Sequence, residues 1–159
     1  RVLGTDHPRT LNTCNNLASA YVSAERLDEA ITLYEQVAQD QARVLGTDHP
    51  RTLTTLNNIA YTYRSVGRLP EAITLYEQVM KDQIRILGDN HPGTYNTRRE
   101  LADSYREAGR TDESIALYEQ LLASSQRVLG DDHPFTMAMC EELEDVRREL
   151  KQRDNPSAD

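Results

Sequence analysis

The sequence contains no tryptophan and a single phenylalanine, Phe135, in 159 residues. Eight tyrosines supply nearly all of the large aromatic side chains, so we expect the bulky core residues to be mostly tyrosines. Glycine and proline are also few, with seven and six copies. Most of these glycines and prolines recur at a fixed spacing of 42 residues.

Positive charge is scarce as well. The chain has 18 Lys and Arg residues against 26 Asp and Glu, a net charge of −8 and a pI of about 5.0. Because nucleic-acid binding draws its affinity from Lys and Arg, this balance argues against a nucleic-acid partner. No apolar run approaches the ~20 residues of a membrane span, and no signal peptide opens the chain. We therefore expect a cytoplasmic protein without a membrane partner.

The only two cysteines, Cys14 and Cys140, occupy the same position of a repeat, three repeats apart. Stacked repeats at that separation cannot bring the two sulfur atoms within disulfide distance. We interpret both as small buried thiols in a reducing compartment.

The string Leu-Gly-x-Asp/Asn-His-Pro occurs four times with a constant step of 42 residues. The copies begin at Leu3, Leu45, Leu87 and Leu129. Residues 1–42 and 43–84 are identical at 30 of 42 aligned positions. A fixed period of this length is typical of stacked-repeat architectures, which present a long surface and have no obvious single catalytic pocket.

Each repeat carries the signals for two helices, as the second repeat shows. Gly46 can end one helix because glycine enters the left-handed cap conformation without a Cβ penalty. Pro50 suits the first position of the next helix, and His49 before it is pushed out of the α region to the N-cap. Apolar residues follow at spacings of three and four up to Gly67, and a second such series starts at Pro70.

Small and aromatic residues in the paired helices resemble the tetratricopeptide repeat (TPR) consensus. The strings that carry the resemblance are Leu17-Ala18-x-x-Tyr21 with Ala30 and Tyr34, Ile59-Ala60-x-x-Tyr63 with Gly67, Ala72 and Tyr76, and Leu101-Ala102-x-x-Tyr105 with Gly109 and Tyr118. Glu25 departs from the turn glycine, and Ser114 from the alanine, of the family pattern. The 42-residue period and the Asn-Asn-Leu-Ala string at 15–18 look like the subclass of kinesin light chains. The chain begins with Arg1-Val2-Leu3, in the middle of a repeat, so we expect a fragment of a larger protein. Similar arrays occur in bacterial proteins, which implies a bacterial parent.

The repeats and the resemblance together predict an all-α fold, a right-handed α-solenoid of seven helices forming a single array over residues 1–152. The three repeats are expected at 8–44, 50–86 and 92–128, followed by a capping helix at 134–152 and a frayed tail at 153–159. The predicted helices span residues 8–24, 28–44, 50–66, 70–86, 92–108, 112–128 and 134–152. Alanines such as Ala18 and Ala60 should let paired helices approach closely, with Tyr21, Tyr63 and Tyr105 filling the space beside them.

The last helix breaks the repeat pattern, because Glu144 and Arg147 stand where earlier repeats have the alanine and the tyrosine. Polar residues at these positions suit a helix that caps the array. We expect this helix to turn Met137, Cys140, Leu143 and Val146 inward.

The resemblance to the family implies that the first helix of each repeat lines a concave face, which would hold a peptide. The candidate groove residues are Asn12, Asn15, Asn16, Ser19, Asn57, Asn58, Tyr61, Arg64, Asn96, Arg99, Asp103 and Arg106. Asparagine offers donors and an acceptor, so a row of them can pair with the backbone of an extended peptide. The same amides could instead bridge adjacent helices, and one asparagine of each pair could serve each purpose.

The family's best-known groove clamps a C-terminal carboxylate of a partner with Lys, Asn and Arg. Here Asn58 matches one slot, whereas Asn15 occupies the lysine slot and Glu100 the arginine slot. A standard carboxylate clamp is therefore not expected. The three arginines of the face remain candidates for binding an acidic or polar side chain of a ligand.

No catalytic residue, cofactor site or metal site is predicted. The four histidines of the Asp/Asn-His-Pro strings belong to different repeats, about 10 Å apart, whereas zinc needs its ligands within ~2 Å of one point. They are better explained as helix caps. Acidic pairs such as Asp28-Glu29 lie at helix starts, where the helix dipole favours anions. The sequence has no phosphate-binding glycine loop and no metalloprotease or hydrolase motif, so we do not expect an enzyme.

The sequence thus predicts a protein-interaction scaffold that binds a peptide or a partner domain on its concave face. One alternative is self-association through the exposed array ends, because no preceding second helix covers Leu11 and its neighbours. Another is a regulatory domain that packs on an adjacent signalling NTPase domain, as the resemblance to bacterial arrays implies.

Overall fold

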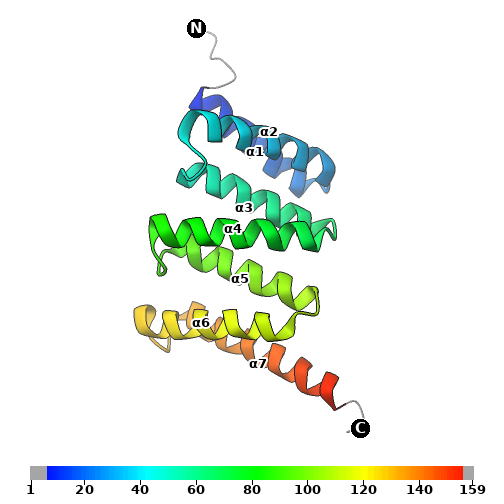
Figure 1. The fold of residues 1–159 in the computed structure, drawn as a ribbon, viewed down its shortest axis with the longest axis vertical. Coiled ribbons are helices and arrows are strands. Elements are labelled where there is room, and N and C mark those ends of the chain that lie inside the picture. Colours follow the sequence, from blue (N-terminus) through cyan, green and yellow to red (C-terminus); the bar gives the residue numbers. More distant parts are fainter. Residues whose placement is uncertain (1–6, 156–159) are drawn as a thin grey trace. The chain divides into compact units, whose positions relative to one another are not determined.

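The structure is a computed structural model, and it describes residues 7–155 of the chain. Within that range the chain is all-α and forms seven helices joined by short turns (Figure 1). The helices are α1 (Pro8–Ser23), α2 (Leu27–Leu45), α3 (Pro50–Ser65), α4 (Leu69–Leu87), α5 (Pro92–Glu107), α6 (Thr111–Leu129) and α7 (Pro134–Asp154).

All seven predicted helices are present, and none of their ends differs from the prediction by more than two residues. The largest difference is at α7, which continues to Asp154, so the first two residues of the predicted frayed tail are helical. Residues 156–159 of that tail lie outside the described residues, as do Leu3 and Gly4 of the first repeat.

Histidine caps the first helix of every repeat, as the sequence predicted. His7, His49, His91 and His133 have extended backbone conformations directly before the prolines. In each, Nδ1 accepts a hydrogen bond of 3.0–3.2 Å from the backbone N–H two residues later. This bond satisfies one of the N–H groups that a helix start leaves without a partner. The recurrent His-Pro string is therefore a structural signal for helix initiation.

Positive φ angles occur at both kinds of helix junction. Gly46 ends α2 with φ 108° and ψ 154°, a combination open essentially only to glycine, and not the left-handed cap conformation that we expected. In the turn inside the repeat, Gly67 has a φ of 77°. Glu25, at the same repeat position, also has a positive φ of 58°, which is unfavourable for a residue with a Cβ.

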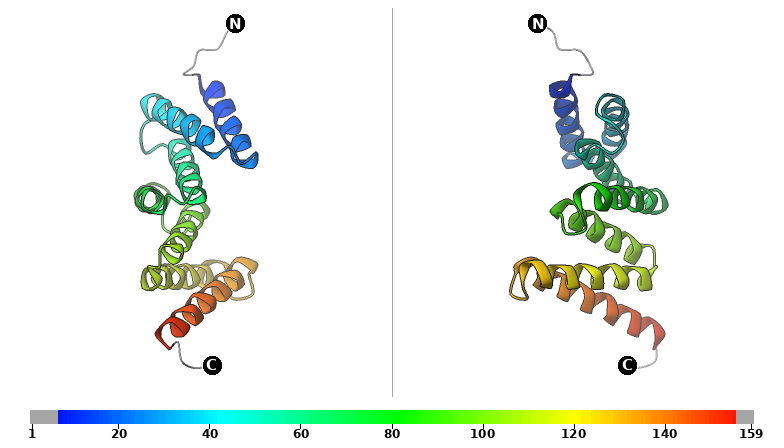
Figure 2. Two further views of the ribbon diagram at one scale, coloured as in Figure 1. Left: turned by 90° about the vertical axis from the view of Figure 1, so that its right-hand side faces the viewer. Right: turned by 60° about the vertical axis from the view of Figure 1, so that its left-hand side comes forward.

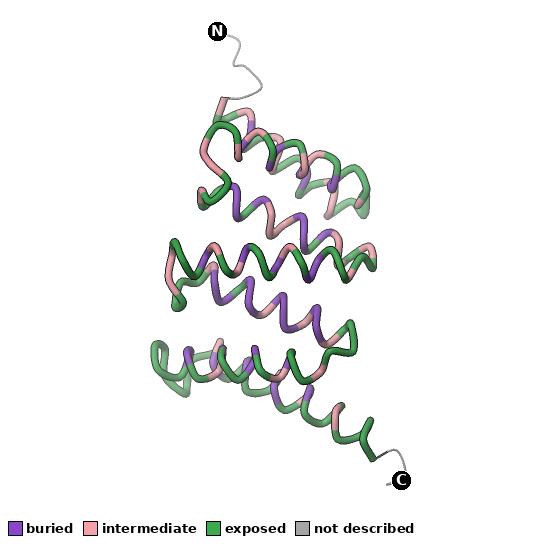
Figure 3. Tube along the Cα trace, in the orientation of Figure 1, coloured by how far each residue is buried: buried purple, intermediate pink, exposed green. Residues whose placement is uncertain are grey.

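The helices group into two compact units, residues 1–86 and 87–159. The first holds α1 to α4 and is called here the N-terminal unit; the second holds α5 to α7 and is the C-terminal unit. In the C-terminal unit, α6 and α7 lie side by side in both views of Figure 2. Buried positions recur about once per turn along α3 and α5 (Figure 3). A single array over residues 1–152 stays a prediction.

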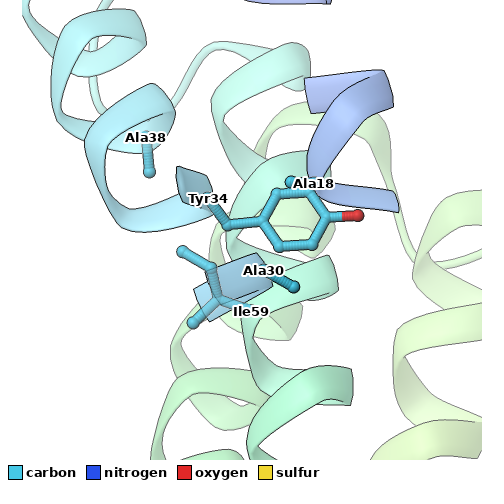
Figure 4. Close-up of a cluster of buried hydrophobic side chains, with 5 residues drawn as sticks. All are labelled: Ala18, Ala30, Tyr34, Ala38 and Ile59. Carbon is cyan, nitrogen blue, oxygen red and sulfur yellow. The ribbon is translucent and has the colours of Figure 1, made fainter. Parts of the chain in front are cut away.

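The core of the N-terminal unit is built around Tyr34 of α2. Its ring lies among the small side chains of Ala18, Ala30 and Ala38 and the branched chain of Ile59 (Figure 4). Ala18 and Ala60, which we expected to let paired helices approach closely, are fully buried. Tyr21 and Tyr63, which we expected beside the alanines, pack against this cluster as half-buried side chains. The fully buried tyrosines lie on the second helices, as Tyr34 does, and those of the first helices are more exposed. The tyrosines of the second helices, Tyr34, Tyr76 and Tyr118, are at most 2% exposed. On the first helices, Tyr21 and Tyr63 are half-buried and Tyr105 is 8% exposed.

The inner side of α7 also differs from the prediction. Leu143 and Val146 are buried as expected, but Met139 takes the place expected for Met137 and Cys140, which are exposed. The buried side of α7 is the one that packs on α6. In the first repeat, the residues that correspond to Met137 and Cys140 are Leu11, which is buried, and Cys14, which is half-buried. The two cysteines are free, and neither is the buried thiol that we expected.

None of the helices between residues 7 and 155 combines the length and the apolar character needed to cross a membrane.

Candidate functional site

The predicted groove residues all lie on first helices of repeats, and the surface that they form within each unit is called here the first-helix face of that unit. In the N-terminal unit this face lies on α1 and α3, and in the C-terminal unit it lies on α5. The 42-residue register extends it to Glu141 and Asp145 of α7, which correspond to Arg99 and Asp103.

Several face residues of the N-terminal unit are accessible to a ligand. Asn12, Asn16 and Ser19 of α1 are exposed, and Tyr61 of α3 is 46% exposed although it is an aromatic residue in the middle of a helix. The remaining face residues of α3 are half-buried: Asn57, Asn58 and Arg64. The first-helix face of this unit thus offers amide, hydroxyl and phenol groups.

Asn15 bridges two helices, which is one of the two roles that the sequence left open for the paired asparagines. Its Oδ1 lies 3.0 Å from the hydroxyl of Thr55 on α3, and that hydroxyl lies 2.8 Å from Oε1 of Gln41 on α2. Thr55 and Gln41 are buried, and buried polar groups need such partners. In the first repeat, therefore, Asn15 contributes to packing and its neighbour Asn16 is exposed.

A second contact links the face to the second helix of the same repeat. The hydroxyl groups of Ser19 and Tyr34 lie 2.6 Å apart. At the same repeat positions in the C-terminal unit, Tyr118 donates a hydrogen bond to Asp103. Burial, together with this carboxylate, raises the pKa of the Tyr118 phenol far above its ordinary value. Both face residues thus also satisfy the hydroxyl of a buried tyrosine.

The arginines of the C-terminal unit form ion pairs within the chain. Arg99 lies 2.7 Å from the carboxylate of Glu100. Arg106 of α5 binds two carboxylates of α7, Glu142 at 3.3 Å and Glu149. The hydrogen bond to Glu149 raises the pKa of the Arg106 guanidinium, and the same hydrogen bond lowers the pKa of Glu149. These two arginines are therefore neutralised by neighbouring acidic groups.

The pairing of Arg106 with Glu142 and Glu149 was not predicted from the sequence. Sequence reasoning also missed an aromatic pair, Tyr95 and Phe135, whose rings stack with centroids 5.7 Å apart. A signal was present, because Tyr95 replaces the leucine, and Phe135 the arginine, of the first two repeats.

The face carries hydrogen-bonding and charged side chains, some of which are already paired within the chain. Glu100, which occupies the arginine slot of a carboxylate clamp, is buried and paired with Arg99. In the part of the chain that the structure describes, no three His, Cys, Asp or Glu side chains gather closely enough to hold a metal ion.

The chain matches the family model described as tetratricopeptide repeat over residues 9–82, 51–124 and 93–154. Among curated proteins, none is similar enough to count as a match.

Solved structures of several repeat proteins are similar to this chain. A kinesin light chain protein of Podospora anserina with nearly identical TPR-like repeats is 33% identical, with a TM-score of 0.85, over 97% of this chain and 73% of that chain. BtubC (BKLC) from P. vanneervenii is 16% identical, with a TM-score of 0.71, over 89% and 65% of the two chains. The TPR2AB domain of yeast Sti1, solved in a complex with pHSP90, is 16% identical, with a TM-score of 0.72, over 95% and 51%. The last two similarities concern the fold alone.

Proposed function

Because the chain belongs to the tetratricopeptide repeat family, we propose that it is a protein-interaction module that binds an extended segment of a partner protein on its first-helix face. The observation that carries this proposal is the exposed polar row of the N-terminal unit, formed by Asn12, Asn16, Ser19 and Tyr61. Asparagine is a mediocre helix former, and a tyrosine as exposed as Tyr61 contributes little to the core. Helix stability and packing therefore do not account for these side chains. Side chains of this kind can pair with the backbone of a bound peptide.

The proposal is also supported by the yeast Sti1 domain, a protein of the same fold that was solved in complex with pHSP90. The partner of this chain is proposed only as a protein segment. We place the encounter in the cytoplasm, where the free thiols of Cys14 and Cys140 would stay reduced.

The test uses the 159-residue chain as bait in a pull-down, followed by calorimetry with the partner recovered. Changing Asn12, Asn16 and Tyr61 together to Ala should weaken binding about tenfold or more, since each lost hydrogen bond is worth about 1 kcal/mol. The control changes Gln39 and Lys81, which are exposed at equivalent positions of α2 and α4, to Ala. Equal affinities of the two variants would show that the partner does not bind through the first-helix face.

A second candidate is self-association. Leu11, which we expected to be left uncovered at the array end, is buried, but another residue of α1 favours this candidate. Leu17 of α1 is 46% exposed, whereas Ile59, Leu101 and Leu143 at the same repeat position are 3%, 1% and 3% exposed. Leu17 lines a hollow together with Tyr21 and Leu33, and exposed apolar patches mark interaction sites. If α1 mediates dimerisation, light scattering should show an oligomer that Leu17→Glu returns to a monomer. A monomeric parent chain would exclude this candidate.

A further inference from the structure

An apolar pocket of about 490 Å³ lies in the C-terminal unit, where the start of α5, the end of α6 and the start of α7 meet. Its volume is within the ~300–1,000 Å³ range of ligand pockets. Tyr95 of α5, Phe135 of α7, and Val128 and Leu129 of α6 contribute apolar lining. Asn96, a residue of the first-helix face, lines the same pocket. The pocket therefore adjoins one end of that face.

The wall of the pocket is a stacked aromatic pair. The rings of Tyr95 and Phe135 are nearly parallel, with an interplanar angle of 9°. Phe135 is held in place by His133, whose Nδ1 accepts its backbone N–H at 3.1 Å, and Tyr95 donates a hydrogen bond to Asn90 at 3.3 Å. The hydrogen bonds thus hold the Phe135 backbone and the Tyr95 phenol, and the two rings stack on each other. Such preorganisation reduces the entropy lost on binding.

The aromatic pair of the pocket departs from the repeat pattern, whereas Val128 and Leu129 keep it, as Val44-Leu45 and Ile86-Leu87 do. The first two repeats have Leu11 and Leu53 in place of Tyr95, and Arg9 and Arg51 in place of Phe135. Val128 and Leu129 remain 49% and 40% exposed beside the aromatic pair. Apolar groups that gather in a hollow and stay accessible to water are typical of an interaction site.

Charge indicates the kind of partner. Residues 87–159 contain nine Lys and Arg against sixteen Asp and Glu, whereas residues 1–86 contain nine against ten. The C-terminal unit therefore carries most of the negative charge. On its first-helix face, Arg99 and Arg106 are ion-paired, and Glu141 of α7 is exposed. A field of this sign attracts positively charged segments and repels acidic ones.

We propose that this pocket anchors a large apolar side chain of a basic partner segment, whose Lys or Arg side chains lie along the acidic first-helix face of α5 and α7. This proposal rests on the proposed function and names its partner chemistry. Asn96 and Asp103 are seven residues apart on α5, or ~10 Å along the helix. An extended peptide covers that length in about three residues. The segment therefore has its first basic residue three or four positions from the apolar anchor.

The test measures fluorescence polarisation of labelled ten-residue synthetic peptides with the full 159-residue chain. The reference peptide carries Leu, Met or Phe followed by Lys at the third and fourth positions after it, in a Ser and Gly background. Matched peptides replace the anchor by Ser, or both Lys by Glu. We expect binding of the reference peptides, a loss of at least tenfold on either replacement, and weaker binding as salt is raised. Equal binding of all three peptides would overturn the proposal.

Two pairs of protein variants locate the site. Phe135→Arg introduces the residue that the first two repeats carry at this position, and its control Met137→Arg makes the same change at an exposed residue of α7 that does not line the pocket. Glu141→Gln lies on the first-helix face, and its control Glu144→Gln removes an exposed carboxylate at the position of Ala18. We expect at least tenfold weaker binding for Phe135→Arg, two- to fivefold for Glu141→Gln, and no change for either control.

The outcomes separate this proposal from the proposed function. Binding that ignores Phe135 but is lost in the Asn12, Asn16 and Tyr61 variant would overturn the pocket proposal and leave the proposed function intact. A pull-down partner that contacts the first-helix face without an apolar and basic segment would do the same. If no peptide binds and the pull-down recovers nothing, both proposals fail.

Discussion

The phenol of Tyr63 on α3 donates a 2.6 Å hydrogen bond to the carboxylate of Glu35 on α2. At the same two repeat positions of the C-terminal unit, Arg147 of α7 pairs with Glu119 of α6. The repeat position thus keeps its contact with an acidic residue although the tyrosine has become an arginine. This exchange explains how α7 can be polar, as expected for a capping helix, and still be attached to the helix before it.

The first prediction concerns the stability that the Tyr63 hydroxyl provides. Tyr63→Phe removes a hydrogen bond to a charged acceptor and should lower the free energy of unfolding by about 1–2 kcal/mol. Tyr63→Ala should lower it further because the half-buried ring is also lost. Urea denaturation measures both values. Tyr61→Phe, at an exposed position nearby, serves as the control and should change stability by less than about 0.5 kcal/mol; a matching loss there would contradict the role given to Glu35.

The same pair predicts a pH dependence. The hydrogen bond to Glu35, together with burial, raises the pKa of Tyr63 above its ordinary value. Its contribution is fully present below the unfolded-state pKa of about 10 and is lost as the pH rises through the higher folded-state pKa. The stability difference between the parent chain and Tyr63→Phe should therefore shrink above about pH 10. Denaturation at several alkaline pH values measures it, and a constant difference would argue against the raised pKa.

The turn inside each repeat provides a matched pair of substitutions. Glu25 adopts a φ of 58° that costs a non-glycine residue about 1 kcal/mol. Glu25→Gly should therefore raise the free energy of unfolding by about 0.5–1 kcal/mol, after the extra flexibility of glycine in the unfolded chain is included. Gly67→Ala should lower it by about 1 kcal/mol. An added Cβ at Gly67 would meet no atom within 4 Å, so backbone strain alone decides the sign. Thermal melts of both variants test this; destabilisation by Glu25→Gly would show that the side chain matters more than the backbone.

Arg98 provides a prediction about buried charge. It is only 3% exposed, pairs through Nη2 with Asp89, and has no hydrogen-bond partner for Nε or Nη1 among the described residues. Burying a charge carries a large desolvation penalty. Leu56 occupies the corresponding position of the second repeat. Arg98→Leu should therefore be neutral or stabilising by about 1–4 kcal/mol.

Removing the partner of Arg98 should have the opposite effect. Asp89→Asn leaves the buried guanidinium without its counter-charge and should lower the free energy of unfolding by about 2 kcal/mol. This is less than the ~3–5 kcal/mol for breaking a fully buried ion pair, because the Asp89 side chain is 49% exposed. Combining the two substitutions should cancel most of this loss. Urea denaturation of the two single variants and the double variant forms a complete cycle. A strong loss of stability in Arg98→Leu would mean that the arginine has packing contacts that leucine cannot replace.

The sequence by itself determined the number of helices, their bounds and the way they start. The His-Pro string initiates helices through two local effects. The proline ring fixes a helical φ at the first position, and the imidazole accepts a hydrogen bond from the backbone N–H two residues after the histidine. The apolar spacing of three and four depends only on the geometry of one helix. Such local causes also explain why the resemblance to the TPR family could be stated from the residues alone.

The tertiary structure decided what each side chain contacts. A residue of a first helix can face a neighbouring helix or water, and the sequence offers no means to choose between them. Asn15 bridges to Thr55, 40 residues later, and Arg106 pairs with Glu142 and Glu149, 36 and 43 residues later. The buried side of α7 and the stacking of Tyr95 on Phe135 depend on how separate helices pack. Helix formation depends on neighbours in the chain, whereas partners and pockets arise between helices that only folding brings together.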